Sequence, residues 1–186
     1  SWLQGIGTIS DFYRTQLSVL QKALGIPESF LDSCNLPLCK EPEELIATEL
    51  DFYNRPQRLI PEAFVAWSEM KGAAQQDGVS IFLISAFRDI QYQHDLIAKK
   101  LNEGSSLESI LSVNAAPGFS EHHTGRAVDI GTLGCDALVE AFEQTNAFQW
   151  LKVNGNKHGF FMSYPRGNKF GINYEPWHWC FCRDYK

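Results

Sequence analysis

Two short blocks of the sequence carry histidines and carboxylates at spacings that suit a catalytic metal site. In the first block, SEHHTGRAVD, His122 precedes Asp129 by seven positions, with small residues between them. In the second block, EPWHW, Glu175 precedes His178 by three positions. A catalytic zinc site needs three nitrogen or oxygen ligands, an open position for water, and a carboxylate that takes a proton from that water. Together the two blocks supply all of these groups.

The direction of the backbone decides whether these side chains can meet. If residues 126–130 form a strand, its two aliphatic residues face the core, while Ala127 and Asp129 face the other way, into a cleft. On a regular strand, Glu175 and His178 would point to opposite faces of the sheet. A kink at the proline between them, or the end of the strand, is therefore needed to direct both at one ion.

The composition is typical of a compact globular protein. The chain has 186 residues, of which 44% are hydrophobic and 20% charged. Its formal net charge of -6 argues against a sequence-independent nucleic-acid binder, which needs a surplus of lysine and arginine. The longest apolar stretches, such as residues 79–87, are far shorter than the roughly 20 residues that span a bilayer. We expect a monomer with no nucleic-acid partner, no transmembrane segment and no visible signal peptide.

The cysteines leave the cellular compartment open. Their number is odd, so at least one is not in an intramolecular disulfide. The first two flank a proline-containing loop, and they could bridge each other or the last two, or all could be buried thiols. Their spacings do not form the paired knuckles of a cysteine zinc site. The five are Cys34, Cys39, Cys135, Cys180 and Cys182.

The N-terminal part of the chain has the apolar spacing of helices. We predict a helix over residues 11–24, capped by Ser10, and a second helix over residues 41–52. A polar, proline-containing stretch follows and is the best candidate boundary. The sequence thus predicts a helical extension over residues 1–58 and a catalytic domain over residues 59–186.

The second region alternates helices with β-branched and aromatic strands. Helices packed on one side of a small, mostly antiparallel sheet are expected, which is an α+β fold. Arg88 would lie where the first strand ends. The predicted helices are 61–77, 90–102 and 137–153, and the predicted strands are 79–87, 126–130, 159–164 and 173–181, the last two forming a pair.

At these blocks the chain resembles the zinc D-alanyl-D-alanine carboxypeptidases of the VanY type. SEHHTGRAVD matches the family signature SxHxxGxAxD, and YEPWHW matches its ExxH block. SAFRDIQYQ looks like the SxYRxxxxQ stretch, and GFFMSYPRG is similar to the segment before EPWH. The four blocks follow the family's order between about Leu59 and Cys182. The resemblance implies a hedgehog/DD-peptidase-like fold.

The resemblance also implies roles for the metal-site residues. His122, Asp129 and His178 match the ligands of zinc (Zn2+), and Glu175 matches the general base. In that mechanism zinc acidifies water, and the glutamate takes the proton and passes it to the leaving amine.

Four further residues match positions that hold the terminal D-residue of the substrate. Arg88 offers a planar fork that pairs with a carboxylate, as recognition of a free C-terminus requires. Gln93 and Ser120 can add hydrogen bonds, and Trp177 an apolar wall. Arg88 is also expected to stabilise the developing oxyanion.

Two positions depart from the family pattern, and neither is a metal ligand. Phe87 stands where a tyrosine is usual, and His123 where a glutamine is common. We interpret His123 as a structural residue or as a support for the ligands. His94 and His158 are interpreted as ordinary surface or core histidines.

The resemblance implies a carboxypeptidase that removes the C-terminal D-amino acid from peptidoglycan stem peptides, outside the cytoplasm in the bacterial cell envelope. Whether the bond cut is a D,D or an L,D bond stays open. One alternative is an endopeptidase of the same fold, which Arg88 disfavours. Another is a non-catalytic zinc-containing recognition module for the cell wall, which has no use for Glu175 as a base.

Overall fold

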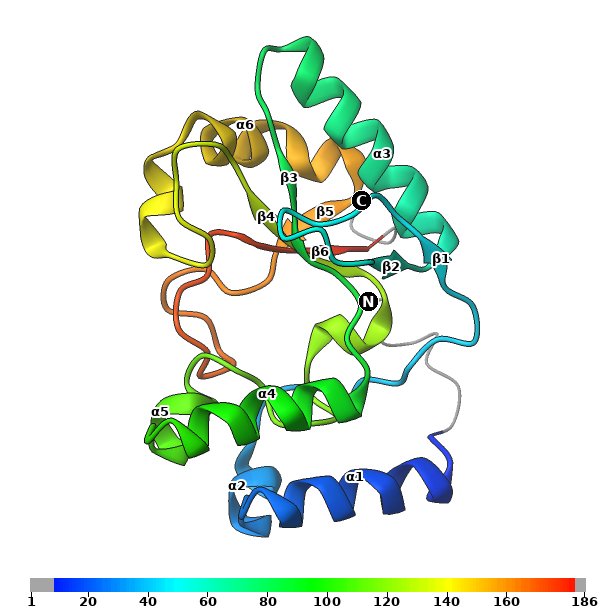
Figure 1. Ribbon diagram of the computed structural model, residues 1–186, viewed down its shortest axis with the longest axis vertical. Helices are drawn as coiled ribbons and strands as arrows, with labels where there is room; N and C mark the ends of the chain where they lie inside the picture. The colour runs from blue at the N-terminus through cyan, green and yellow to red at the C-terminus, as the bar shows by residue number, and fades with distance from the viewer. Residues whose placement is uncertain (1–8, 183–186) are drawn as a thin grey trace.

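The computed structural model describes residues 9–182 of the chain. Figure 1 shows their arrangement. In this part of the chain, no helix is both long and apolar enough to cross a membrane. The α-helices are α1 (Asp11–Ala23), α2 (Glu28–Ser33), α3 (Pro61–Gln76), α4 (Ile90–Asn102), α5 (Leu107–Leu111) and α6 (Asn146–Asn154). The strands are β1 (Ile46–Ala47), β2 (Arg58–Leu59), β3 (Phe82–Ser85), β4 (Ala127–Gly131), β5 (Phe160–Met162) and β6 (His178–Phe181). Short 3-10 helices are η2 (Glu121–Thr124), η3 (Glu140–Gln144) and η4 (Gly155–His158).

Four strands form the central sheet in the order β3-β4-β6-β5, and each neighbouring pair is antiparallel. Strands β1 and β2 form a separate antiparallel pair. Helices and small antiparallel sheets thus make an α+β fold, as the sequence predicted.

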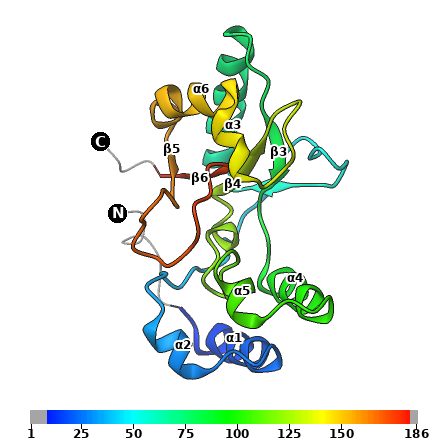
Figure 2. The same ribbon diagram turned by 90° about the vertical axis from the view of Figure 1, so that its left-hand side faces the viewer.

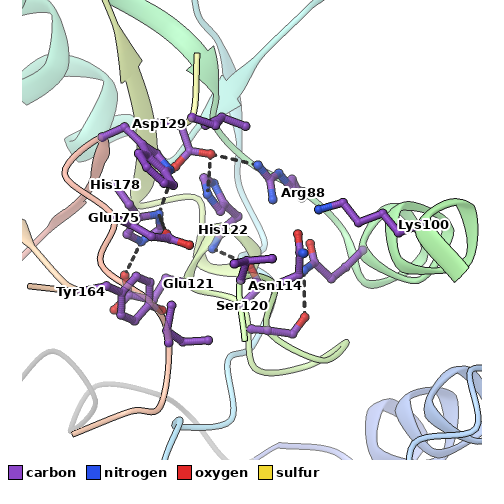
Figure 3. Close-up of a pocket in the computed structure, with 16 residues that line it drawn as sticks. Arg88, Lys100, Asn114, Ser120, Glu121, His122, Asp129, Tyr164, Glu175 and His178 are labelled. Carbon is purple, nitrogen blue, oxygen red and sulfur yellow. Dashed lines mark hydrogen bonds and ion pairs between the residues drawn. The ribbon is translucent and has the colours of Figure 1, made fainter. Parts of the chain in front are cut away.

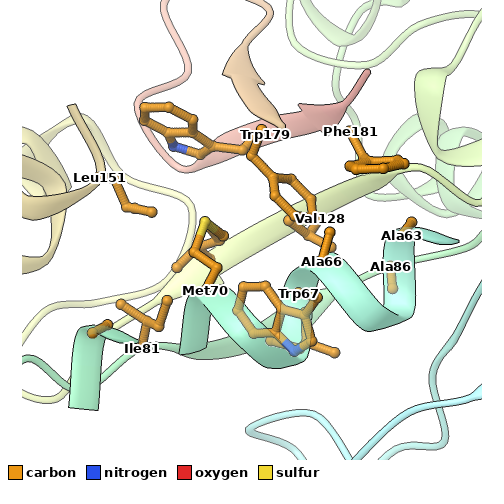
Figure 4. Close-up of a cluster of buried hydrophobic side chains, with 14 of the residues drawn as sticks. Ala63, Ala66, Trp67, Met70, Ile81, Ala86, Val128, Leu151, Trp179 and Phe181 are labelled. Atoms are coloured by element: carbon orange, nitrogen blue, oxygen red, sulfur yellow. The ribbon is translucent and has the colours of Figure 1, made fainter. Parts of the chain in front are cut away.

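The main hydrophobic core lies between one face of the central sheet and helices α3 and α6 (Figure 4). Alternate residues of β4, Val128 and Ile130, point into this core, and so do Trp179 and Phe181 of β6. Trp67 of α3 is fully buried against them. Because side chains alternate along a strand, the residues between them face the opposite side of the sheet. That opposite side carries the candidate site.

Helices α1, α2, α4 and α5 form a second layer below the sheet (Figures 1 and 2). A smaller apolar cluster joins them, with Leu24 and Ile26 from the N-terminal region packed on Ile97 of α4 and Ile110 of α5. In addition, the buried side chain of Gln21 donates a hydrogen bond to the Pro117 carbonyl. The N-terminal region is therefore packed directly against α4, which borders the site, and against α5.

The prediction of a helix over residues 41–52 was wrong. Tertiary partners extend this segment: Ile46 pairs with Leu59 across β1 and β2, and the Glu41 carboxylate accepts a hydrogen bond from the backbone of Ile90 at the start of α4. These contacts outweigh a local helical preference, which is a weak one. The helix that does follow α1 is α2, which the sequence had not indicated.

The β1–β2 pair joins the two predicted regions across the proposed boundary at residues 53–57. The buried Asp51 also accepts a hydrogen bond from the side chain of Gln57. These contacts link the two sides of the boundary, and the division into two regions at residue 58 stays a prediction from sequence.

Other predicted elements were confirmed with changed limits. Helices α1, α3 and α4 match their predictions closely. Strand β3 is shorter than residues 79–87, and the helix predicted over residues 137–153 is divided, because Thr145 accepts a hydrogen bond from the Phe148 backbone and caps α6 there. The last strand begins only at His178, although it pairs with β5 as expected. All five cysteines lie in the described residues and are free thiols.

Candidate active site

Three neighbouring strands place polar side chains in a row on the open face of the sheet. Asp129 of β4 is the register partner of Ser85 in β3 and of His178 in β6. Directly opposed residues of antiparallel strands point to the same side of a sheet. Strand register therefore brings Asp129 and His178 together, although they are 49 positions apart in the chain.

The remaining histidine of the site comes from the turn before β4. Ser120 caps the short helix η2 by accepting a hydrogen bond from the His122 backbone. The helix ends at Gly125, which has a left-handed φ of 67°. A Cβ there would lie 2.8 Å from a methyl group of Leu45 and 3.1 Å from one of Ile60. Only glycine fits this position without strain, so it fixes the turn that presents His122.

These residues line a cleft of about 250 Å³ (Figure 3). His122, Asp129 and His178 are all buried, and each offers a ligand atom within 4.8 Å of the others. The cleft is lined by Arg88, Gln93, Lys100, Val113, Asn114, Ala115, Ser120, Glu121, His122, Asp129, Leu138, Tyr164, Ile172, Glu175, Trp177 and His178.

Hydrogen bonds identify which nitrogen of each ring faces the centre of this cluster. The Nδ1 atom of His122 lies 2.6 Å from the Ala86 carbonyl, which can only accept, so this nitrogen carries the proton. Its unprotonated Nε2 atom then faces Asp129 Oδ2 at 3.2 Å. The Nε2 atom of His178 lies 2.8 Å from Glu121 Oε2, and its Nδ1 atom lies 3.1 Å from Asp129 Oδ1. At His122, therefore, the Nε2 lone pair faces the Asp129 carboxylate without a proton between them.

This arrangement fits a divalent cation. Burial opposes the charge of Asp129, yet His122, His178 and Arg88 hold the pKa of this carboxyl well below its ordinary value. Burial also disfavours the charged form of His178, but its hydrogen bonds to Asp129 and Glu121 raise its pKa to about 10. Two imidazoles and one carboxylate are a common donor set for catalytic zinc. Binding of a cation here would require His178 to give up its Nδ1 proton.

Glu175 lies beside the cluster without being bound into it. Its carboxylate is 3.9 Å from His178 Nδ1 and accepts no hydrogen bond from any described residue. Burial raises its pKa to about 7, against the opposing charge of His178. The side chain reaches the cleft because the backbone turns between Glu175 and the first residue of β6, where the His178 amide donates to the Glu175 carbonyl. This is the strand-end geometry that the sequence required.

Arg88 lies at the end of β3, on the wall of the same cleft. Its Nε atom donates to Ser85 Oγ at 2.9 Å, and one terminal nitrogen lies 2.9 Å from Asp129 Oδ2. The backbone around it is fixed as well: its amide donates to the His122 carbonyl, and its carbonyl accepts from His123. The guanidinium is thereby held within reach of both the candidate metal ligands and the open cleft.

The other three residues matched to substrate contacts also line the cleft. The amide nitrogen of Gln93 donates to the Ala115 carbonyl at 2.8 Å, while its buried Oε1 has no partner among the described residues. Ser120 is buried and caps η2. Trp177 is partly buried against the main core.

The remaining histidines are not part of the His122, Asp129 and His178 cluster. His123 bridges the backbone, with Nε2 accepting from Gly118 and Nδ1 donating to Arg88. Burial lowers its pKa to about 4, so the ring is neutral. His94 contacts the neighbouring Asp95, and His158 stacks on a tryptophan.

Sequence reasoning missed three polar residues of the cleft. Glu121 lies between two residues of the quoted signature and binds His178. Tyr164 packs against the same ring at a tilt, with 4.8 Å between ring centroids. Lys100 follows Gln93 by seven positions, which puts both on one side of α4, so helical spacing could have indicated it.

Comparison with known proteins gives consistent matches over most of the chain. Residues 56–184 match the VanY family, described as D-alanyl-D-alanine carboxypeptidase. The chain is 33% identical to the Bacillus subtilis protein YodJ over 82% of its own length and 59% of that protein's. It is 31% identical to a D-alanyl-D-alanine carboxypeptidase of Enterococcus faecium, over 60% of its own length and 33% of that enzyme's. The chain thus spans less than two thirds of either relative's length.

The fold is also similar to a solved structure. The LdcB LD-carboxypeptidase, whose structure concerns peptidoglycan recognition, superimposes with a TM-score of 0.68 at 29% identity. The match covers 78% of this chain and 71% of LdcB.

Proposed function

Because this chain belongs to the VanY family of D-alanyl-D-alanine carboxypeptidases, we propose that it hydrolyses the C-terminal D-amino acid from peptidoglycan stem peptides with a zinc ion in its cleft. The observation that carries the proposal is the convergence of His122 Nε2, Asp129 and His178 Nδ1 beside the unbound carboxylate of Glu175. A zinc ion there supplies the positive charge that acidifies water and polarises a peptide carbonyl.

Glu175 is the general base in this proposal. Its carboxylate is free of hydrogen bonds to the described residues, and burial raises its pKa to about 7. A neighbouring divalent cation favours its charged form, so it is ready to accept a proton from water. The same carboxyl group then delivers the proton to the leaving amine.

Arg88 orients the substrate by its terminal carboxylate. A guanidinium offers five N–H donors, and contacts to Ser85 and Asp129 use only part of them. The remaining donors face a cleft that also holds Ser120 and Trp177. A charged anchor for a free C-terminus favours an exopeptidase over the alternative endopeptidase, whose substrates continue beyond the cut bond.

The place of action follows from the substrate. Stem peptides lie in the cell wall, so we propose that the protein acts outside the cytoplasm. The region before residue 58 is proposed as a packed extension of the catalytic domain, because Gln21 contacts Pro117 and the apolar residues after α1 and in α2 contact α4 and α5.

The test is the release of D-alanine from defined stem peptides. Zinc-loaded protein is incubated with a tetrapeptide and a pentapeptide stem, and the products are identified by mass. Loss of one terminal D-alanine from the pentapeptide indicates D,D activity, as in the name of the Enterococcus faecium relative, and loss from the tetrapeptide indicates L,D activity, as in that of LdcB. Cleavage inside the stem, or no cleavage by the zinc-loaded protein, contradicts the proposal.

A further inference from the structure

Lys100 is a cation of the cleft that the match to the family blocks does not include. It lies on α4, two helical turns beyond Gln93, and Figure 3 shows its side chain extending from the helix toward Arg88. It makes no hydrogen bond or ion pair with any described residue. The neighbouring Lys99 differs in both respects: its side chain is 75% exposed and lies 3.9 Å from Glu103.

The surroundings of Lys100 disfavour an unpaired positive charge. Burial lowers its pKa, and the nearby Arg88 lowers it further, while Glu175 and Glu103 oppose this. A partly buried ammonium without a partner is costly, and an anionic ligand in the cleft removes that cost. Two cations that converge on one wall of a cleft therefore indicate a binding position for a negative group.

Lys100 adds to the few charged donors on this wall of the cleft. Arg88 is partly engaged by Ser85 and Asp129. Gln93 already donates its amide to Ala115, and its free atom is an acceptor, which a carboxylate cannot use. An ammonium adds up to three donors at the same wall.

We propose that Lys100 binds the C-terminal carboxylate of the substrate together with Arg88, and so contributes to the selection of peptides with a free C-terminus. The inference rests on the proposed function, because it concerns the same cleft. In this role Lys100 contacts the substrate away from the bond that is cut. Its contribution is therefore to binding rather than to the chemical step.

The experiment compares Lys100→Gln and Lys100→Arg with Lys99→Gln, which removes the same charge one position away on the exposed side of α4. Each zinc-loaded variant is assayed on the stem peptide that the wild type cleaves and on the same peptide with an amidated C-terminus. Lys100→Gln should raise KM for the free acid about tenfold with little change in kcat, as loss of a charge-assisted contact does. Lys100→Arg keeps the positive charge and should have a KM close to that of the wild type. Lys99→Gln should have the same KM as the wild type.

The amidated peptide tests which group Lys100 binds. In the wild type, KM should be lower for the free acid than for the amide, and the ratio of the two KM values should fall about tenfold in Lys100→Gln. An equal rise in KM for both peptides would mean that Lys100 acts on the structure of the cleft or on another part of the substrate. That result would overturn the proposal. Unchanged KM in Lys100→Gln would overturn it as well.

A binding measurement separates this inference from the proposed function. D-alanine, which carries the same terminal carboxylate, is titrated into zinc-loaded wild type and Lys100→Gln by calorimetry. Weaker binding to Lys100→Gln, with unchanged binding to Lys99→Gln, supports the inference even if no peptide is cleaved. Equal binding to all three proteins contradicts it, even if cleavage is observed.

Discussion

The Nε2 atom of His178 lies 2.8 Å from Oε2 of Glu121, and this contact directs the opposite ring nitrogen at Asp129. Glu121 is itself held by the hydroxyl group of Ser163 at 2.6 Å. A carboxylate behind a ligand histidine fixes its tautomer and raises its basicity. Glu121 is thus a positioning residue for the candidate metal site.

Glu121→Gln should therefore weaken zinc binding about 10- to 100-fold, as loss of such a supporting carboxylate does. The change keeps the size of the side chain, so the fold should persist, and circular dichroism checks this. Zinc affinity is measured by competition with a chromogenic chelator. Glu69→Gln, on the exposed side of α3, is the control. Equal zinc affinity in both variants would show that Glu121 does not support His178.

Gly118 connects the N-terminal region to the loop that carries the site. Its carbonyl accepts from Cys39, its amide donates to His123, and its φ is +95°. A Cβ at this position would lie 2.8 Å from a methyl group of Leu17 on α1. Gly104 has the same φ but no atom within 4 Å of such a Cβ, which makes it a matched control.

Gly118→Ala should destabilise the protein by about 1–3 kcal/mol more than Gly104→Ala. Both substitutions strain a left-handed backbone, but only the first must also displace the buried side chain of Leu17. Urea denaturation of the two variants measures the difference. Equal losses of unfolding free energy would mean that α1 does not pack on this loop as described.

Asp51 holds together the turn that leads into β2. Its buried carboxylate accepts hydrogen bonds from the backbone of Tyr53 and Arg55 and from the side chains of Arg55 and Gln57. Burial alone raises the pKa of Asp51, but these hydrogen bonds outweigh it and lower the pKa below the ordinary value of 3.8. The folded protein thus favours the charged form.

Asp51→Asn should lower the free energy of unfolding by about 1–3 kcal/mol at pH 7. A depressed pKa stabilises the fold fully above the unfolded value, and this contribution is lost as pH falls through the folded value. The difference in unfolding free energy between wild type and variant should therefore persist at pH 5 and shrink only below about pH 4. Thermal melts across this range, with the exposed Asp136→Asn as control, measure it. A deficit that already disappears between pH 7 and pH 5 would contradict this account.

Local sequence patterns were sufficient for much of the fold. The two-residue period of residues 126–130 correctly placed Asp129 opposite the core, and the predicted cap Ser10 begins α1. Such features depend on neighbours in the chain, so a sequence displays them.

Features that depend on distant partners were not predictable in this way. The register that opposes Asp129 to His178 and Ser85 is set by the packing of three strands. Residues 41–52 are extended because Ile46 finds its partner in β2, which local helical propensity does not reveal. Glu121 was passed over because nothing in its own neighbourhood shows that it reaches His178.

Glu175 should be dispensable for metal binding and essential for turnover. Glu175→Gln removes the base without touching the three ligands, so the zinc-loaded variant should lose turnover by a factor of about 100 or more. D-alanine release at saturating peptide measures this, with the zinc content of each sample determined in parallel. Turnover close to that of the wild type would require another base.

His122, Asp129 and His178 should together hold one divalent cation. Zinc content after equilibrium dialysis tests it most directly, in the wild type and in Asp129→Asn, His178→Ala and Glu175→Gln. The wild type and Glu175→Gln should each retain one zinc ion per chain, while the other two variants should lose most of theirs at the same free zinc concentration. Full zinc content in Asp129→Asn and His178→Ala, or none in the wild type, would contradict the account.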